Sequence, residues 1–150
     1  MSDPVIRISY APPSHGWLTL TVSVNEQAVE IDASDVPNNP VEELLSALEL
    51  AANSVPSSVW WHLEPAGYFM YFTPINGSIH FKIEYAAHSE QAQGKSVVEI
   101  SGSPAQILLP FWRFVREFQT HEFEEPHWPV TDWNRILAVK DSILLSCVSD

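Results

Sequence analysis

Apolar and polar residues alternate along several short stretches of the chain, which is the pattern of strands with one buried face. The clearest stretch covers residues 17–24, whose alternating apolar positions are Leu18, Leu20, Val22 and Val24. Residues 5–10 alternate in the same way, and a shorter run at 28–31 extends the pattern. The first third of the chain is therefore predicted to form a β-meander.

A second group of strand-like runs follows at residues 59–64, 68–73, 79–85 and 97–100. Asn76-Gly77 separates two of these runs and is a strong signal for a two-residue hairpin turn. Pro65, Ala66 and Gly67 form a turn between the first two. Such short connections favour antiparallel pairing of neighbouring strands.

A first helix is predicted between these two groups of strands. Asn39 is suited to cap its N-terminus, Pro40 takes the first helical position, and Glu42 and Glu43 lie in the first turn. Apolar residues then recur at helical spacing and form one stripe along the helix. Pro56 prevents much extension beyond residue 54.

The last third of the chain is predicted to be helical. Ser103 and Gln106 match a capping box with Pro104 at the first helical position. Pro110 lacks an N–H donor and is expected to kink this helix or restart it. Thr131 or Asp132 is suited to cap a final helix.

These elements predict one α+β domain over residues 1–150. Its expected core is an antiparallel sheet of about five to seven strands, with two to three helices packed mainly on one face. The length of 150 residues and the hydrophobic content of 45% are enough for a substantial core. Aromatic residues make up 11% of the chain, which argues against intrinsic disorder.

Acidic residues dominate the charge, giving a formal net charge of −12. Arg7 is the one Lys or Arg among residues 1–81, where nine carboxylates lie. Nucleic acid is therefore an unfavourable partner, since its binding normally needs a basic patch. A basic protein partner would be attracted by the same field. The alternative interpretation is that the acidic surface serves solubility alone.

Location is expected to be cytoplasmic, without a membrane segment. The first residues lack the basic and apolar regions of a signal peptide, and no apolar run reaches the roughly 18–20 residues that span a bilayer. Cys147 is the single cysteine, so no disulfide forms within the chain. Its apolar helical surroundings predict a buried, inert thiol.

Catalytic and cofactor motifs are not found, so no catalytic residue, cofactor or metal ligand is assigned and an enzyme is disfavoured. The chain has no G-x-S-x-G elbow, dinucleotide fingerprint or P-loop. The segment from His121 to His127 combines imidazole and carboxylate groups suited to zinc. Its six-residue histidine spacing and Pro126 do not match the helical zinc-protease pattern, which favours a solvated acidic loop.

Aromatic residues supply the main candidates for a binding surface. Trp60 and Trp61 are adjacent in one predicted strand and must point to opposite faces of the sheet. Either both faces are covered, or one face exposes an aromatic patch that marks a binding site. The predicted partner-binding residues are Trp60, Trp61, Glu122, Glu124, Glu125, Trp128 and Asp132.

The layout from residue 38 to residue 118 resembles small acidic bacterial proteins of uncharacterised families. Some of these are similar to immunity proteins of polymorphic toxin systems. The resemblance is carried by a capped Leu-rich helix, a "WHLEPAGYFMYF" strand pair, an Asn-Gly hairpin and a "LLPFWRFVREF" helix. It implies a stoichiometric binding role, because immunity proteins act by occluding a toxin.

Three functions remain open at this point. The first is a non-catalytic binding protein, such as an immunity protein or inhibitor of a basic toxin. The second is a small-molecule-binding or enzymatic domain with an aromatic pocket, in which His62, His80 and Glu64 supply the polar groups. The third is a homo-oligomeric structural protein that associates through its aromatic face.

Overall fold

The structure is a computed structural model that describes residues 4–35, 38–90, 94–120 and 131–148. It contains one seven-stranded sheet, and every neighbouring pair of strands is antiparallel. The strands are β1 (Ile6–Tyr10), β2 (Trp17–Val24), β3 (Gln27–Ser34), β4 (Ser57–His62), β5 (Gly67–Ile75), β6 (Ser78–Ala86) and β7 (Lys95–Gly102). Their order in the sheet follows their order in the chain.

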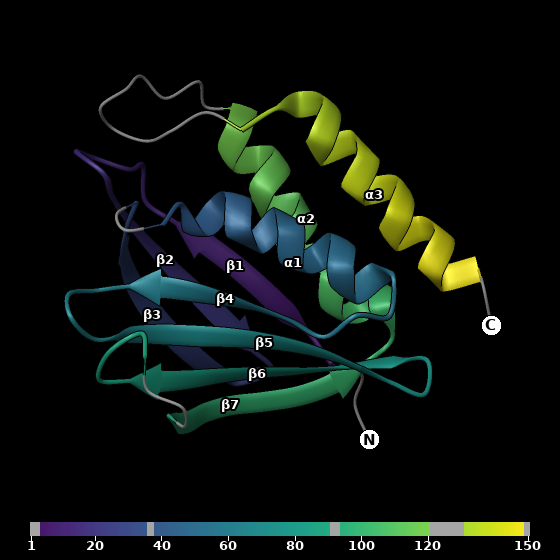
Figure 1. Cartoon of the computed structure of the whole chain (residues 1–150), viewed down its shortest axis with the longest axis horizontal. Helices are drawn as coiled ribbons and strands as arrows, with labels where there is room; N and C mark the ends of the chain where they lie inside the picture. The colour runs from purple at the N-terminus through teal and green to yellow at the C-terminus, as the bar shows by residue number, and fades with distance from the viewer. Residues whose placement is uncertain (1–3, 36–37, 91–93, 121–130, 149–150) are drawn as a thin grey trace.

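Three helices within the described residues complete the fold and confirm the predicted α+β class. They are α1 (Pro40–Ala52), α2 (Pro104–Thr120) and α3 (Trp133–Val148). α1 packs on β4 and β5, whereas α2 packs on β1, β6 and β7 (Figure 1). α3 lies outside these two helices and packs on both, so the helices form two layers on one face of the sheet.

The sheet is narrow at its centre, where β3 meets β4. Ser34 and His62 are the one matched pair that joins these strands, whereas eight pairs join β2 to β3. α1 connects β3 to β4 in the chain and packs against β4. The sheet therefore consists of two meanders, β1–β3 and β4–β7, joined by one bridge and covered by a helix. We call this junction the seam.

The two meanders curl around α2. The ring of Phe111 lies 5.3 Å from that of Phe72 and 5.0 Å from that of Phe81, between centroids. On the other side of α2, the ring of Phe114 lies 5.3 Å from that of Tyr10 in β1. Aromatic pairs of this kind contribute about 0.5–1.5 kcal/mol each beyond the area they bury. α2 thus holds both parts of the sheet in one core.

Local signals in the sequence produce the predicted ends of the elements. The Asn39 side chain accepts hydrogen bonds from the N–H groups of Val41 and Glu42 at the start of α1. Ser103 and Gln106 form the reciprocal bonds of a capping box. Asn76 and Gly77 both have positive φ, at 50° and 83°, as the two-residue hairpin turn requires.

The structure decides between the two outcomes predicted for Pro110, and it contradicts the burial predicted for Cys147. α2 runs without interruption through Pro110, so the helix does not restart there. The missing hydrogen bond is offset by buried apolar residues on both sides of it, including Leu108 and Phe111. Cys147 is partly exposed, because it lies beside the packed face of α3 rather than on it.

Candidate partner-binding surface

The two neighbouring tryptophans lie on opposite faces of β4, as predicted. Trp61 points towards the helices and has an exposed fraction of 0%, so it belongs to the hydrophobic core. Trp60 lies on the other face and is 6% exposed. Neither indole offers a large free surface, so direct contact of either with a partner stays a prediction.

The remaining predicted contact residues divide into two groups. Glu122, Glu124, Glu125 and Trp128 lie outside the described residues, as does the His121–His127 segment. Asp132 is described, and its carboxylate accepts a hydrogen bond of 3.0 Å from the N–H of Asn134. Asp132 therefore caps α3, while its exposed position leaves it accessible.

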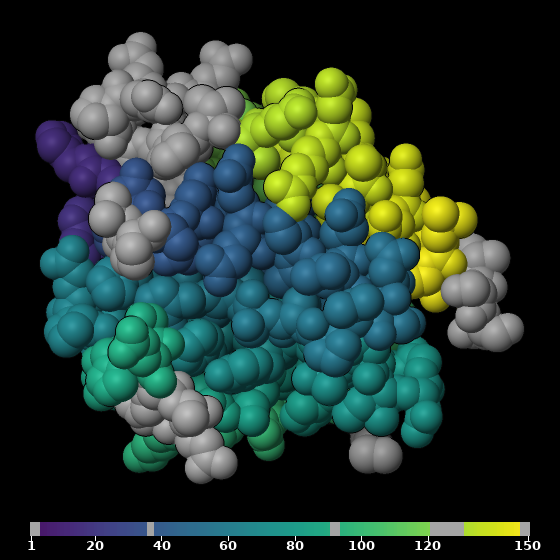
Figure 2. Space-filling view, viewed as in Figure 1, coloured from purple at the N-terminus to yellow at the C-terminus, as the bar shows by residue number. Residues whose placement is uncertain are grey.

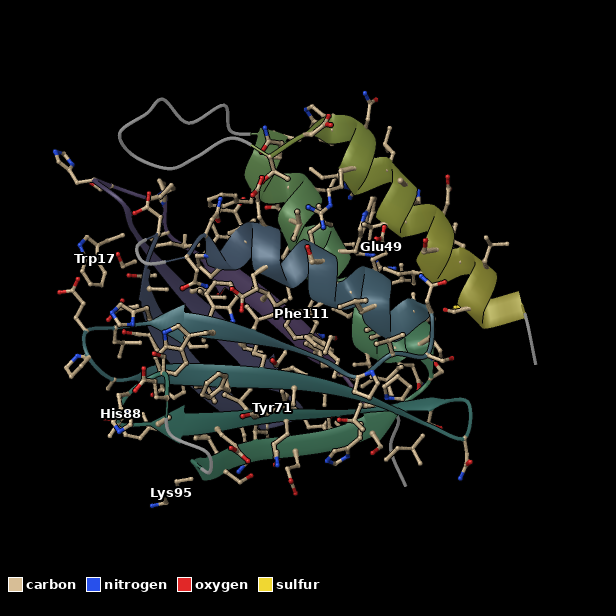
Figure 3. All side chains as sticks on the ribbon, in the orientation of Figure 1. Trp17, Glu49, Tyr71, His88, Lys95 and Phe111 are labelled. Carbon is tan, nitrogen blue, oxygen red and sulfur yellow. The ribbon has the colours of Figure 1, made fainter. Side chains whose placement is uncertain are left out.

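The face of the sheet turned away from the helices, called the outer face here, carries a row of aligned residues. Strand register places Trp17 opposite Ser34, Ser34 opposite His62, and His62 opposite Gly67. The row therefore crosses the seam and runs through β2, β3, β4 and β5. Trp17 lies at one end of it with 42% of its surface exposed (Figure 3).

Aromatic rings shield one another beside this row. Trp60 lies across Gly67, because two of its ring atoms come within 2.5 Å of where a Gly67 Cβ would be. Its ring centroid is 4.6 Å from that of Phe69, and Phe69 in turn stacks on Tyr71 at 5.6 Å. The Trp60 indole N–H donates to Nδ1 of His62 at 3.0 Å. The sequence left two outcomes open for this face of the sheet, coverage by another layer or exposure of an aromatic patch. Trp60 follows neither, because neighbouring side chains of the same face bury it.

At the seam, hydrogen bonds from side chains take the place of a continuous ladder of backbone hydrogen bonds between β3 and β4. The Trp60 N–H donates to Oε1 of Glu43 at 2.8 Å, and Nδ2 of Asn38 donates to the Trp60 carbonyl at 2.9 Å. Nδ2 of Asn38 also donates to Oε2 of Glu43 at 2.6 Å. Two side chains from the start of α1 thus satisfy backbone groups of β4 that a neighbouring strand would otherwise bind.

A charged group continues the outer face into β6. Nζ of Lys82 lies 5.4 Å from the Tyr71 ring centroid and 2.7 Å from Oε2 of Glu84. The hydrogen bond from Lys82 lowers the pKa of Glu84 and raises that of Lys82. Burial, followed by the nearby Glu84 carboxylate, raises the pKa of Tyr71. Lys82 is thus already paired, and its charge is neutralised locally.

Two carboxylates, those of Asp32 and Asp35, lie near the Trp17 end of the row. Residues 8–81 contain eight carboxylates and no Lys or Arg. Asp32 is exposed on the outer face, where its Oδ1 accepts a 2.5 Å hydrogen bond from the Thr19 hydroxyl. Asp35 follows β3 beside Gly16, close to the start of β2. An exposed indole therefore lies within a negatively charged region, an arrangement that suits a cationic surface.

Trp17 was not among the residues singled out from the sequence, although the sequence held the signal. Leu18 begins the buried series of β2, so strict alternation places Trp17 on the same face as Thr19. Because Thr19 faces away from the core, Trp17 does so too, and its side chain is exposed. The cross-strand neighbours Ser34 and His62 could not be identified, because the register across the seam depends on α1 and not on a turn.

The arrangement required by an aromatic pocket is not observed. His62 pairs with Gly67 at one end of β5, whereas His80 pairs with Thr73 near the other end. Six residues of strand separate these positions, a distance of roughly 20 Å at about 3.3 Å per residue. A cavity of about 100 Å³ lies elsewhere, between the ends of α1, α2 and α3 and the β5–β6 hairpin. Among the described residues, no three His, Cys, Asp or Glu side chains are grouped to hold a metal ion.

Comparison with known proteins adds little to this geometry. No family model matches the chain. No curated protein matches it either. A solved structure of a CdiA-CT/CdiI toxin and immunity complex from Enterobacter cloacae contains a chain similar to this one. The match has 9% identity and a TM-score of 0.38, and covers 80% of this chain and 99% of that one.

At this level the likeness carries no argument about function. The described part of the chain defines the class of protein as an α+β domain with an open antiparallel sheet. None of its described helices is both long enough and apolar enough to cross a bilayer.

Proposed function

We propose that this protein is a non-catalytic binding domain that occludes a basic protein, in the manner of an immunity protein or an inhibitor of a basic toxin. The observation that carries the proposal is the exposed Trp17 at the end of the outer-face row, within a chain segment that has eight carboxylates and no Lys or Arg. An exposed large aromatic side chain is a typical centre of a binding hot spot. The surrounding negative charge selects a cationic partner and speeds the encounter.

The rigidity of the outer face supports the same proposal. Trp60, Phe69 and Tyr71 are held in place by one another, and the seam is fixed by Asn38 and Glu43. A partner that docks on this surface meets a preorganised platform, so little conformational entropy is lost on binding. The segment with Glu122, Glu124, Glu125 and Trp128 belongs to the proposal as a further acidic and aromatic contact, on the strength of its sequence.

The test begins with identification of the partner. The tagged protein is immobilised at low salt, exposed to a lysate of its own cells, and the bound proteins are identified by mass spectrometry. Each basic protein recovered is then purified and titrated by calorimetry. We expect a one-to-one complex that weakens as salt rises, because screening shortens the reach of the acidic field.

Two tryptophan variants locate the interface. Trp17→Ala is expected to weaken the complex by about 30-fold, the equivalent of a hot spot worth about 2 kcal/mol. Trp133→Ala is the matched control, because Trp133 is 41% exposed but lies on α3. Asp32→Asn is expected to slow association more than it accelerates dissociation. Equal weakening by both tryptophan variants, or the absence of any basic partner at low salt, would contradict the proposal.

A further inference from the structure

Within the described residues, three contacts join a cation to an aromatic ring, and each uses a Lys or Arg of this chain. The rings are those of Tyr71 and Trp112, with the cationic atoms 5.1 to 5.4 Å from the ring centroids. Trp17 makes no contact of this kind with the described part of the chain, although 42% of its surface is exposed. Its ring is therefore open to a cation from another molecule.

A tight turn holds the backbone of Trp17 at the start of β2. The Trp17 N–H donates to the Ser14 carbonyl at 3.0 Å, and the Ser14 N–H donates to the Trp17 carbonyl at 2.9 Å. His15 and Gly16 between them have positive φ, at 51° and 81°, as a type I′ turn requires. Figure 2 shows the β1–β2 connection (purple) at the edge of the molecule, at the opposite end from the C-terminal end of α3 (yellow). The indole thus projects from a fixed backbone at an accessible edge.

The carboxylate of Asp32 lies beside Trp17 on the same face of the sheet. Trp17 pairs with Ser34, so Asp32 is its diagonal neighbour on β3. Diagonal neighbours have Cα atoms about 7–8 Å apart, within reach of one long side chain. The Thr19 hydroxyl holds Oδ1 of Asp32 at 2.5 Å, while the other oxygen keeps its lone pairs. No Lys or Arg within the described residues forms an ion pair with Asp32.

The first meander offers no cation of its own to this end of the sheet. Arg7 is the one Lys or Arg in β1–β3, and it pairs with Ser23 near the other end of β2. Six residues of strand separate Ser23 from Trp17, roughly 20 Å at about 3.3 Å per residue. Glu30, which is exposed on the same face two residues from Asp32, adds a second negative charge. An indole and a carboxylate therefore lie together without a competing cation from these strands.

We propose that Trp17 and Asp32 together bind an arginine side chain of the basic partner, with the guanidinium stacked on the indole and its N–H groups donated to the Asp32 carboxylate. This inference rests on the proposed function and names the chemical group that the Trp17 end of the row recognises. A guanidinium is planar and weakly hydrated, and it presents its donors in a fixed fork that matches a carboxylate.

Other partner side chains satisfy only half of this site. An apolar residue on Trp17 would take water away from Asp32 and leave the carboxylate without a replacement hydrogen bond, which is costly. A lysine would neutralise Asp32, but its compact ammonium is strongly hydrated and has no plane to stack on the indole. Arginine covers the ring and satisfies the carboxylate at the same time, so the site should prefer arginine to lysine at equal charge.

Two capped tripeptides of equal charge, Gly-Arg-Gly and Gly-Lys-Gly, test this preference. Each is titrated into the full chain at one fixed, low ionic strength, and binding is followed by NMR at the Trp17 indole N–H and the Thr19 backbone N–H. We expect the arginine peptide to bind this site about fivefold more tightly, the size of a cation–π contact at an exposed site.

Three variants assign the preference to the two side chains. Asp32→Asn keeps an acceptor for the Thr19 hydroxyl, loses the charge, and should remove most of the arginine preference. Trp17→Leu keeps an apolar side chain without the aromatic face and should do the same, with the Thr19 N–H as the reporter. Glu30→Gln is the matched control, because it removes one charge from the same face of the same strand. It should weaken both peptides equally and leave their ratio unchanged.

The outcomes separate this inference from the proposed function. Equal affinity for the two peptides, the absence of any shift at the Trp17 indole, or a preference that survives Asp32→Asn would overturn the arginine site. The basic-protein proposal would still stand in each case, because charge alone attracts such a partner. That proposal fails on its own test, if no basic protein is captured at low salt.

Discussion

Gly67→Ala isolates the contribution of close packing between β4 and β5. An added Cβ would lie 2.4 Å from the carbonyl oxygen of Trp61 and 2.5 Å from the ring of Trp60. The first of these atoms belongs to the backbone, so relief requires a shift of β4 itself. Gly67 does not have positive φ, which means that alanine suits its backbone conformation and the cost is purely steric.

The expected cost is at the upper end of overpacking, about 3 kcal/mol. Gly77→Ala is the matched control, because no atom lies within 4 Å of its Cβ position and only its positive φ of 83° is unfavourable. Strain of that kind costs about 1 kcal/mol. For a chain of this size, a difference of about 2 kcal/mol corresponds to a gap of roughly 4–8 °C in Tm.

Urea unfolding followed by tryptophan fluorescence measures both variants. The fluorescence of the folded Gly67→Ala protein should also change, because the Trp60 ring must leave its position across residue 67. A Gly67→Ala protein within about 0.5 kcal/mol of Gly77→Ala would refute the reasoning, since the backbone would then have absorbed the added methyl group without strain.

Two further predictions concern charged groups. Glu43→Gln should lower the free energy of unfolding by about 2 kcal/mol, because the Trp60 N–H and Nδ2 of Asn38 donate to different carboxylate oxygens and glutamine replaces one of these with an NH2 group that cannot accept. In urea titrations the exposed neighbour Glu42→Gln should cost less than half as much, and equal losses would show that the seam bonds contribute nothing. The second concerns Glu84, whose pKa is lowered in the folded protein by Lys82, so its stabilisation is present above pH ~4.5 and is lost as the pH falls through the lowered pKa. Glu84→Gln should therefore flatten the acid side of a stability–pH curve measured by thermal unfolding, and an unchanged slope would contradict this assignment.

The sequence predicted the elements of this fold more fully than their arrangement. Asn39, Ser103 and the Asn76-Gly77 turn act through contacts within a few residues, so their effects could be identified from local spacing. β3 extends to Ser34, beyond the predicted run at 28–31, and its buried Val29, Ile31 and Ala33 continue the alternation with the exposed Glu30 and Asp32. The curling of the sheet around α2 depends on pairs such as Tyr10 with Phe114, more than 100 residues apart, which no local pattern encodes.

The candidate surface was predicted only in part, for a similar reason. The opposite orientation of Trp60 and Trp61 followed from the period of a strand. The burial of Trp60 by Gly67, Phe69 and His62 did not, because it depends on the register between β4 and β5 and on the missing side chain of a glycine. Trp17 was overlooked as a contact residue because it stands in a stretch whose apolar residues are otherwise buried.

The near absence of pairing between β3 and β4 has a consequence for how the protein assembles. Every other strand pairs with its immediate successor in the chain, so each meander forms from nearest-neighbour contacts with a small loss of loop entropy. The joining step is different, because the pair Ser34 and His62 closes across the whole segment of chain that contains α1. We therefore expect each meander to unfold locally as a unit, with α1 as the element that holds the two together.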